Sequence, residues 1–454
     1  MLDYDDPRRP QVVQRVVKEI KDKGIKYCWL EFLSIDGFLK SVGINSNRIE
    51  GILETGEGFD GSSIDGYGRL EESDMVAIPD PSTFAIVPWI RGGDKVARFL
   101  CDIYRPDESR YEGDARYILQ RQIRRAKKLG FDMQAAPELE FFLLKKENSH
   151  DVPQATDIRG YFDGDPGDKD QFLRRKIALY AENFPDTEVE TVHHEVARSQ
   201  HEIDIRYNEV GKIADSCITM RTIVKAVAAQ NNYIGTFMPK PWSGHNGSGM
   251  HVHMSLWDKD MKKNMFYDTE DPNKISDNLR YWIGGLLKYA KDITAVLNSW
   301  PNSYKRLIPG YEAPTYISWG FKNRSMLIRV PNFFDKSKAA RCEIRSPDPA
   351  GNIYLQMAVL LAAGLEGICN KIDPGEPTEI NVFGMTRKER KDMGIRNLPE
   401  SLGQALHIYR NSDFMKKVLG KPGYDAYYDL KIKENQRYNS QVSEWELKRY
   451  AGRL

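Results

Sequence analysis

Carboxylate and imidazole side chains gather in a few short segments of this 454-residue chain. The central segment runs from Asn246 to Ser255, where an Asn-Gly-Ser-Gly sequence precedes His251 and His253. Carboxylate oxygens with one or two imidazoles suit Mg²⁺ or Mn²⁺ better than Zn²⁺. The candidate metal ligands are Glu138, Glu140, Glu195, Glu202, His251 and Glu343. Beside nearby arginines, which suit anions, this set indicates phosphoryl transfer from ATP.

Strand periodicity predicts that Glu138 and Glu140 share one face, because side chains two apart in a strand point the same way. Phe141 and Leu143 would then fill the opposite face. A solvated strand face is the alternative interpretation. The apolar neighbours favour a buried carboxylate pair, and buried carboxylates need a cation.

Glu195 and Glu202 are seven residues apart, and each follows a histidine. A helix would align them, and so would two strands joined by a turn over residues 197–199. Simple surface exposure is the alternative for either residue. The zinc-protease pattern H-E-x-x-H is excluded, because Arg198 stands where the second histidine would be.

The glycine-rich segment before His251 exposes backbone amides and lets a ligand approach closely. It matches neither the P-loop nor the G-x-G-x-x-G pattern, since Val252 occupies the last glycine position of the latter. His251 and His253 flank Val252 in a strand-like run and should face one side, although a purely structural histidine is the alternative. The sequence therefore predicts a nucleotide site of another type.

Arginines accompany the later carboxylates. Arg341, Glu343 and Arg345 lie two apart, so one strand would present a metal ligand beside an anion ligand. Further candidates are Arg306 and Glu312, in a loop bracketed by prolines, and then Arg324 and Arg329. Surface solvation is the alternative, but apolar neighbours favour partial burial, where an arginine needs an anionic partner.

The composition excludes several classes of protein. The chain has 66 Lys and Arg against 65 Asp and Glu, a formal charge of +1, which argues against nucleic-acid or anionic-membrane binding. Five cysteines without a C-x-x-C pair are typical of reduced thiols. The charged N-terminus lacks the apolar region of a signal peptide, and the best apolar run, residues 357–365, is too short to span a bilayer. We therefore expect a soluble, cytoplasmic protein.

Helix and strand patterns alternate irregularly, which favours an α+β fold with an antiparallel sheet. An N-terminal helix should end near Gly24, a hairpin should turn at Asp36-Gly37, and residues 56–68 should form an exposed loop. Beyond a polar boundary at residues 105–114, the expected helices are 115–129, 169–183, 214–230, 276–297 and 352–371. The expected strands there are 132–144, 187–195, 199–206, 233–239, 249–257 and 324–330.

Five segments resemble type I glutamine synthetase, in order and over nearly the whole chain from about residue 15. They are Phe59-Asp-Gly-Ser-Ser-Ile64, Pro137-Glu-Leu-Glu-Phe-Phe142, His193-His-Glu-Val-Ala197, Asn246-Gly-Ser-Gly-Met-His251 and Lys305-Arg-Leu-Ile-Pro-Gly-Tyr-Glu-Ala-Pro314. The resemblance implies an N-terminal helix over residues 1–23, a small β-grasp domain over 24–110, and a catalytic domain over 111–454 with a curved antiparallel sheet and flanking helices. It implies ATP-dependent ligation of ammonia to L-glutamate through a γ-glutamyl phosphate. It also implies a homododecamer of two six-membered rings with active sites between neighbouring subunits.

The resemblance further implies a role for each matching residue. Of two Mg²⁺ or Mn²⁺ sites, the first maps to Glu140, Glu195 and Glu202, and the second to Glu138, His251 and Glu343. L-Glutamate would be bound by Asn246, Gly247, Arg306 and Arg345, with Glu312 on a closing flap. ATP would contact Glu190, His253, Ser255, Arg329 and Lys338, and Arg324 would stabilise the transferring phosphoryl group. Ammonium would meet Tyr161 together with Asp60 and Ser63 of the adjacent subunit, and Asp60 would remove its proton.

Departures from the family pattern bear on regulation. Leu139 replaces a proline common in the metal strand, which should be harmless. Phe383 stands where one subgroup carries an adenylylated tyrosine, so that modification is excluded at this position. Arg69 resembles the residue through which the other subgroup responds to glutamine, and small-molecule effectors or nitrogen-regulatory proteins are possible partners. The alternatives are a γ-glutamyl ligase for another amine and a non-catalytic homologue, but the expected metal and ammonium residues are all present.

Overall fold

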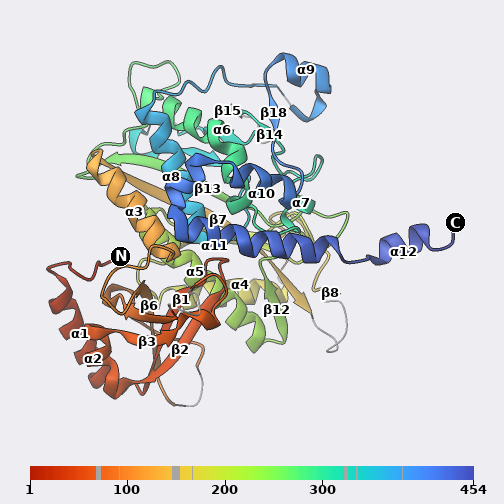
Figure 1. Cartoon of the computed structure of the whole chain (residues 1–454). Coiled ribbons are helices and arrows are strands. Elements are labelled where there is room, and N and C mark those ends of the chain that lie inside the picture. Colours follow the sequence, from red (N-terminus) through yellow and green to blue (C-terminus); the bar gives the residue numbers. More distant parts are fainter. Residues whose placement is uncertain are drawn as a thin grey trace.

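The computed structural model describes residues 1–67, 73–90, 93–145, 154–165, 167–321, 326–333, 336–380 and 382–453. A smaller N-terminal sheet with its own core lies below a larger sheet that is covered by helices (Figure 1). At the other end of the chain, α11 runs along the larger body and α12 projects away from it (Figure 1). Among the described residues, no helix is long and apolar enough to cross a membrane.

The N-terminal sheet has the strand order β2-β1-β6-β4-β3, with β5 also on β6. Its strands are β1 (Tyr27–Leu33), β2 (Leu39–Asn45), β3 (Glu57–Asp60), β4 (Asp74–Pro79), β5 (Ala85–Ile86) and β6 (Val96–Tyr104). The helices α1 (Arg9–Asp22) and α2 (Ile49–Thr55) accompany them. The predicted hairpin is confirmed, because β1 pairs antiparallel with β2 and Gly37 adopts the positive φ of 91° in the turn between them. β1 also pairs in parallel with β6.

The predicted exposed loop over residues 56–68 is partly wrong, since its first part is the strand β3. β3 pairs antiparallel with β4, from Glu57 opposite Ala77 to Asp60 opposite Asp74. The ring of Phe59 packs 5.0 Å from that of Phe32, which anchors the strand on the core. The sequence did not predict this strand, because Phe59 is surrounded by glycines and serines that favour a loop.

The larger sheet has the order β15-β16-β17-β13-β7-β10-β9, and β8, β11 and β12 also pair with β7. These strands are β7 (Phe131–Lys145), β8 (Gln154–Ala155), β9 (Val189–His194), β10 (Gln200–Ile205), β11 (Asn208–Glu209), β12 (Tyr233–Thr236), β13 (Met250–Asp258), β15 (Trp319–Gly320), β16 (Ile328–Arg329) and β17 (Cys342–Ile344). Pairing is antiparallel except between β15 and β16, so the predicted α+β class and antiparallel sheet are confirmed with that one exception. A separate ribbon joins β14 (Tyr316–Ile317) and β18 (Arg396–Asn397).

The larger body also contains the remaining helices of the described chain. They are α3 (Ala115–Lys128), α4 (Lys169–Ala181), α5 (Val210–Gln230), α6 (Asp277–Leu297), α7 (Ser303–Arg306), α8 (Ile353–Cys369), α9 (Arg387–Asp392), α10 (Leu402–Arg410), α11 (Asp413–Asn439) and α12 (Glu444–Tyr450). The predicted helices are present, but α5 begins four residues early, at Val210, because Val210 and Ile213 both reach the core. The predicted strand over residues 324–330 includes Ile328 and Arg329, whereas residues 322–325 lie outside the described chain.

The fully buried Arg116 joins the two parts of the molecule. Its guanidinium on α3 lies 2.8 Å from each of three carboxylates, those of Asp80, Asp102 and Asp215. Asp80 and Asp102 belong to the N-terminal part, and Asp215 lies on α5. Burial raises the pKa of Asp102, but Arg116 and Arg110 outweigh it and lower that pKa to about 2. A buried charge needs such complete pairing, so this contact fixes the N-terminal sheet on the larger body.

Candidate active site

Pairing within the larger sheet gathers the expected carboxylates. On the central strand β7, Glu138 lies opposite His251 of β13, and Glu140 lies opposite Glu202 of β10. β17 brings Glu343 to the other side of β13. Since strands lie about 4.8 Å apart, side chains from all four strands meet on one face. The predicted shared face of Glu138 and Glu140 is confirmed, because both line the same cavity.

Two strands rather than a helix bring Glu195 and Glu202 together. β9 and β10 form an antiparallel hairpin in which Glu202 lies opposite His193, while Ser199 takes a φ of 59° in the turn. His193 Nε2 lies 3.0 Å from Glu202 Oε1, and ligand atoms of His193, Glu195 and Glu202 lie within 4.8 Å of one another. His193 was not among the expected ligands, although strand periodicity places it on the face of Glu195.

A second group surrounds Glu138. Ligand atoms of Glu138, His253 and Glu343 lie within 4.8 Å of one another. His253 Nε2 is 2.7 Å from Glu138 Oε1, and His251 Nδ1 is 2.8 Å from Glu138 Oε2. His251 Nε2 is also 4.0 Å from Glu140 Oε1, so this ring lies between the two carboxylate groups. His251 was expected as the second-site ligand, and His253 joins it there.

The carboxylates repel one another. Burial and then the charge of Glu140 raise the pKa of Glu202 to about 11 and the pKa of Glu195 to about 7. Burial raises the pKa of Glu343, but Arg345 and the two histidines lower it to about 2. The side of the site near Glu202 therefore lacks positive charge. Carboxylate oxygens with a few imidazoles fit Mg²⁺ or Mn²⁺ here.

The first cavity, of about 500 Å³, is lined by these groups and by most of the expected glutamate-binding residues. Its lining includes Glu138, Glu140, Tyr161, Glu195, Glu202, Asn246, Gly247, His251, Arg306, Glu312, Arg329, Glu343, Arg345 and Phe383. Asn246 Nδ2 donates to Glu312 Oε2 at 2.8 Å, which ties the flap to the glycine-rich segment. Buried Arg345 bonds Glu343 through Nη1, while its Nε has no hydrogen-bond partner among the residues that the structure describes. A substrate carboxylate would satisfy that donor.

The second cavity, of about 460 Å³, lies on the other side of Glu138, which lines both. It contains the expected ATP contacts Glu190, His253, Ser255 and Lys338. Arg329 instead lines the first cavity, where its Nε donates to Glu343 Oε2 at 2.6 Å. Tyr207, Lys336 and Arg341 also line the second cavity and were not predicted. These residues come from segments far apart in the sequence, which only the fold brings to one cavity.

Four expected residues lie outside both cavities or outside the described residues. Asp60 and Ser63 lie at the end of β3, and within the described chain they line neither cavity. Asp60 accepts hydrogen bonds from Ser62 Oγ at 2.7 Å, from Ser62 N at 2.9 Å and from Ser63 Oγ at 3.0 Å, and these bonds lower its pKa. Arg324 and Arg69 lie outside the described residues.

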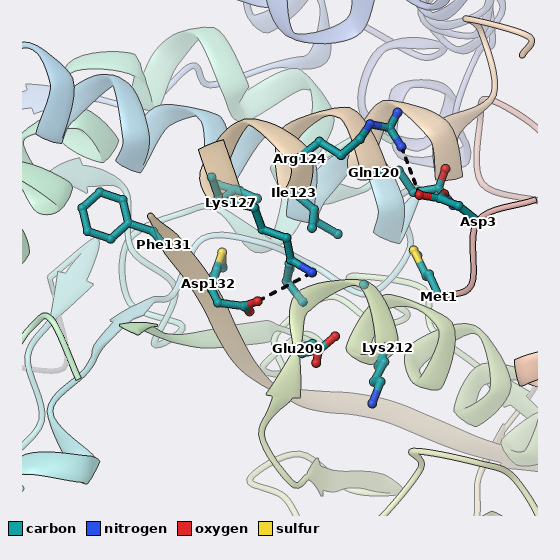
Figure 2. Close-up of a pocket in the computed structure, with 15 residues that line it drawn as sticks. Met1, Asp3, Gln120, Ile123, Arg124, Lys127, Phe131, Asp132, Glu209 and Lys212 are labelled. Carbon is teal, nitrogen blue, oxygen red and sulfur yellow. Dashed lines mark ion pairs between the residues drawn. The ribbon is translucent and has the colours of Figure 1, made fainter. Parts of the chain in front are cut away.

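A smaller cavity of about 160 Å³ lies apart from these two, beside the N-terminus of the chain (Figure 2). Charged pairs flank it, with Lys127 Nζ 3.9 Å from Asp132 and Arg124 Nη1 3.7 Å from Asp3. The Met1 side chain reaches Gly211, where an added Cβ would lie 2.9 Å from Met1 Sδ. In the described chain it shares no lining residue with the other two cavities, so the carboxylate face remains the candidate active site.

Comparison with protein families accounts for this arrangement. The model of the glutamine synthetase catalytic domain matches residues 112–450, and that of the glutamine synthetase beta-Grasp domain matches residues 24–106. A β-grasp domain followed by this catalytic domain defines a class of ATP-dependent ligases that form glutamine. The chain belongs to the glutamine synthetase family. The predicted family, fold and enzyme class are therefore confirmed.

Relatives extend over almost the full length. The glutamine synthetase of Methanosarcina mazei is 47% identical over 440 residues, which is 97% of each chain. That of Thermotoga maritima is 46% identical over 96% of this chain and 99% of its own. Among solved structures, the Plasmodium falciparum glutamine synthetase superposes with a TM-score of 0.86 at 25% identity, covering 99% of this chain and 100% of its own. A GmaS–ADP complex superposes with a TM-score of 0.84 at 28% identity, covering 96% of this chain and 99% of its own.

These findings support ATP-dependent glutamine synthesis, the function expected from the sequence. They do not favour the ligation of another amine or a non-catalytic role. The family also needs a divalent metal and ATP, in agreement with the carboxylate groups on the site.

Gly249 should be essential to the shape of this site. An added Cβ would lie 2.5 Å from Arg306 Nη2 and 3.0 Å from Glu140 Oε1, so Gly249→Ala must displace both groups. Because a misplacement of about 1 Å can cost on the order of 10²-fold, we expect a loss of that size in kcat/KM for glutamate. Steady-state kinetics and thermal unfolding would measure it. Gly51→Ala is the matched control, since nothing lies within 4 Å of a Cβ there. Parent-like kinetics of Gly249→Ala would contradict the assignment.

Proposed function

We propose that glutamate and ATP occupy the first and second cavities and react across Glu138 to give γ-glutamyl phosphate, which ammonia then converts to L-glutamine. The observation that carries this proposal is the position of the Glu138 carboxylate, which lines both cavities and touches His251 and His253. A phosphoryl group that passes between two bound substrates must cross such a shared wall. The γ-carboxylate of glutamate is a poor electrophile, and its phosphorylation supplies a leaving group.

Glutamate binding falls to Asn246, Gly247, Arg306 and Arg345. The Nε of Arg345, which has no hydrogen-bond partner among the described residues, supports a role in carboxylate recognition. Arg306 is buried, and its guanidinium donates to the backbone carbonyls of Ser346 at 2.8 Å and Arg345 at 3.0 Å. The positive charge of Arg306 would thus add to the electrostatic potential of the first cavity, while these backbone contacts hold its side chain in place. Glu312 would close over the bound amino acid and exclude water from the acyl phosphate.

Two Mg²⁺ or Mn²⁺ ions per site would neutralise the negative charge of the clustered carboxylates. Glu140, Glu195 and Glu202 would hold one, and Glu138, His251 and Glu343 the other, with His193 and His253 adjacent. When bound, such ions neutralise charge on the phosphoryl oxygens during transfer. Glu190, His253, Ser255, Arg329 and Lys338 would position ATP, and Arg324 would stabilise the phosphoryl group in transit.

Ammonium would bind among Tyr161, Glu195 and Glu312 of one subunit and Asp60 and Ser63 of the next. The anionic carboxylates favour the cation, and Asp60 would remove its proton before attack. Asp60 lines neither cavity of its own chain, in the described residues, which supports donation to a neighbour in a homododecamer of two six-membered rings.

Regulation would not involve adenylylation, since Phe383 has no hydroxyl to modify. Glutamine feedback through Arg69, or control by nitrogen-regulatory proteins, remains a prediction from the resemblance. We also propose a cytoplasmic location, in keeping with five cysteines that are all free thiols.

The activity can be tested against its alternative with a panel of amines. We expect the purified enzyme to release phosphate from ATP with glutamate and ammonium, and to form glutamine in equal amount. Methylamine, ethylamine and a polyamine should react at least about tenfold less well in kcat/KM, since bulkier cations would leave the carboxylates imperfectly paired. Coupled phosphate release and product chromatography measure both quantities. A higher kcat/KM for one of the other amines would overturn the assignment to ammonia.

The metal assignment predicts that Glu138→Gln is nearly inactive. The loss of the Glu138 charge between the cavities should lower turnover by on the order of 10²-fold or more. Even the mutation of a residue that only contacts a metal ligand lowers metal affinity or activity by about 10–100-fold. Activity titrated with Mg²⁺ and Mn²⁺, together with metal binding by calorimetry, would measure the effect. Glu188→Gln is the control, because that side chain is exposed and pairs only with Arg206, at 2.8 Å, in the described chain. Parent-like metal affinity of Glu138→Gln would refute the assignment.

Donation of Asp60 by a neighbour predicts complementation between inactive chains. Asp60→Ala and Arg345→Ala chains should each be inactive alone. Mixed rings should regain about a quarter of parental activity, the statistical share of interfaces in which both side chains are intact. Asp60→Ala mixed with the Asp60→Ala/Arg345→Ala double variant is the control, because no interface there has an intact Asp60. If mass spectrometry confirms mixed rings and no activity returns, the shared site is disproved.

A further inference from the structure

A buried polar network lies beside the β9–β10 hairpin, on the side opposite to the metal-binding groups. Strand alternation turns His193 toward Glu202, whereas its neighbour His194 is fully buried and lies opposite His201. Residues 154–165, which we call the strap, connect β8 with the start of α4 and carry Tyr161. Two residues of this strap, Asp157 and Phe162, bond His194.

His194 bonds the strap on both sides of Tyr161. Its Nε2 lies 3.0 Å from Asp157 Oδ2, and its backbone oxygen accepts from Phe162 N at 3.1 Å. Asp157 Oδ1 also accepts from Ser199 N in the hairpin turn, at 2.9 Å. Tyr161 is thus held between two anchors, and it lines the first cavity.

The ring of His194 also holds the backbone of a metal-site residue. Its Nδ1 lies 2.7 Å from the backbone oxygen of Glu195, and its Nε2 faces the Asp157 carboxylate. Both partners are acceptors, and an imidazole can donate from both nitrogens only when it is protonated. The side chains of His194 and Asp157 are 0% and 2% exposed, so they form a buried ion pair. A buried pair of this kind keeps its geometry, because separating it would leave an uncompensated charge.

The neighbouring groups support a structural network rather than a metal centre. Ligand atoms of Asp157, Asp170 and His201 do lie within 4.8 Å of one another. However, Arg174 Nη1 lies 2.9 Å from His201 Nδ1, and an arginine can only donate. The hydrogen of His201 must then be on Nε2, which faces Asp170 Oδ2 at 3.6 Å and offers no lone pair to a cation. Thr156 Oγ1 donates to Asp170 Oδ2 at 2.5 Å and ties the start of the strap to α4.

We propose that Asp157 and His194 are positioning residues for the nucleophile, because their buried pair fixes the strap that carries Tyr161 to the backbone of Glu195 and so shapes the ammonium pocket that both residues line. The proposal rests on the function proposed above and concerns the same site. It predicts that damage to the pair weakens ammonium binding selectively, since Arg306 and Arg345, which would hold glutamate, belong to other elements. ATP binding should be affected least, because the second cavity contains no residue of the strap within the described chain.

Asp157→Asn tests this directly. Asparagine keeps the shape but turns an N–H₂ group toward either His194 Nε2 or Ser199 N, both of which are donors. We expect the KM for ammonium to rise by at least about tenfold, with KM values for glutamate and ATP within about twofold of the parent. Hydroxylamine, a nucleophile that is uncharged at neutral pH, should be used with a kcat close to that of the parent. A purely structural role would not separate these constants.

Asp165→Asn is the matched control within the strap. Asp165 is exposed and bonds Arg159 and Gly167 rather than the hairpin in the described chain, so this variant should keep parental kinetics. His194→Gln is the second variant, because glutamine can still donate to Asp157 while Glu195 O loses its donor. It should raise the ammonium KM in the same direction but less.

Several results would overturn the proposal. Equal increases of all three KM values in folded Asp157→Asn would show a general defect, and a lower unfolding temperature with parental kinetics would show a structural role only. If Asp157→Asn does not fold, a parental ammonium KM in folded His194→Gln refutes the proposal instead. Failure of the parent enzyme to form glutamine would refute the proposed function itself, which is a different result.

Discussion

Crowding of carboxylates on one sheet face is the constraint on which the rest of this structure depends. Glu138, Glu140, Glu195, Glu202 and Glu343 come together from the strands β7, β10 and β17 and from the turn after β9, and burial makes their mutual repulsion costly. Arg345 and Arg329 form ion pairs with Glu343. The remaining charge calls for divalent cations, and we propose that the reacting phosphate lies between the two cavities. The surrounding fold serves to hold these like charges close to one another in the absence of substrates.

Buried ion pairs behind the site supply that rigidity. Arg116 gathers three aspartates where the N-terminal sheet meets the helices, and His194 with Asp157 locks the hairpin that carries Glu195. Neither pair faces the substrate cavities in the described chain. Because removal of one partner from a buried pair typically costs about 3–5 kcal/mol, each pair has essentially one arrangement. The active-site face is thereby fixed from both the domain junction and the far side of the sheet.

The two histidines before Glu195 show that strand alternation points one side chain toward the active site and the next toward a structural contact. His193 faces the carboxylates, and His194 faces the strap. The same alternation places Glu138 and Glu140 toward the cavity and Phe141 in the core. Adjacent residues of one type therefore have unrelated environments, and a substitution at one of them need not resemble a substitution at the other.

Residue chemistry and strand periodicity were sufficient to identify the candidate metal ligands and their preference for a hard cation from the sequence. They also identified the antiparallel α+β class and most of the helices. These features depend on residue type and on neighbours two to four positions away. The tertiary structure decided three other features. It placed Glu195 and Glu202 on a strand hairpin rather than on a helix. It also brought His193 and His253 to the ligand groups and buried His194 against Asp157. The same holds for Phe59, which packs on Phe32 and lies in the strand β3, although the sequence predicted a loop there. Each depends on contacts between segments distant in sequence, and no local pattern encodes which segments will meet.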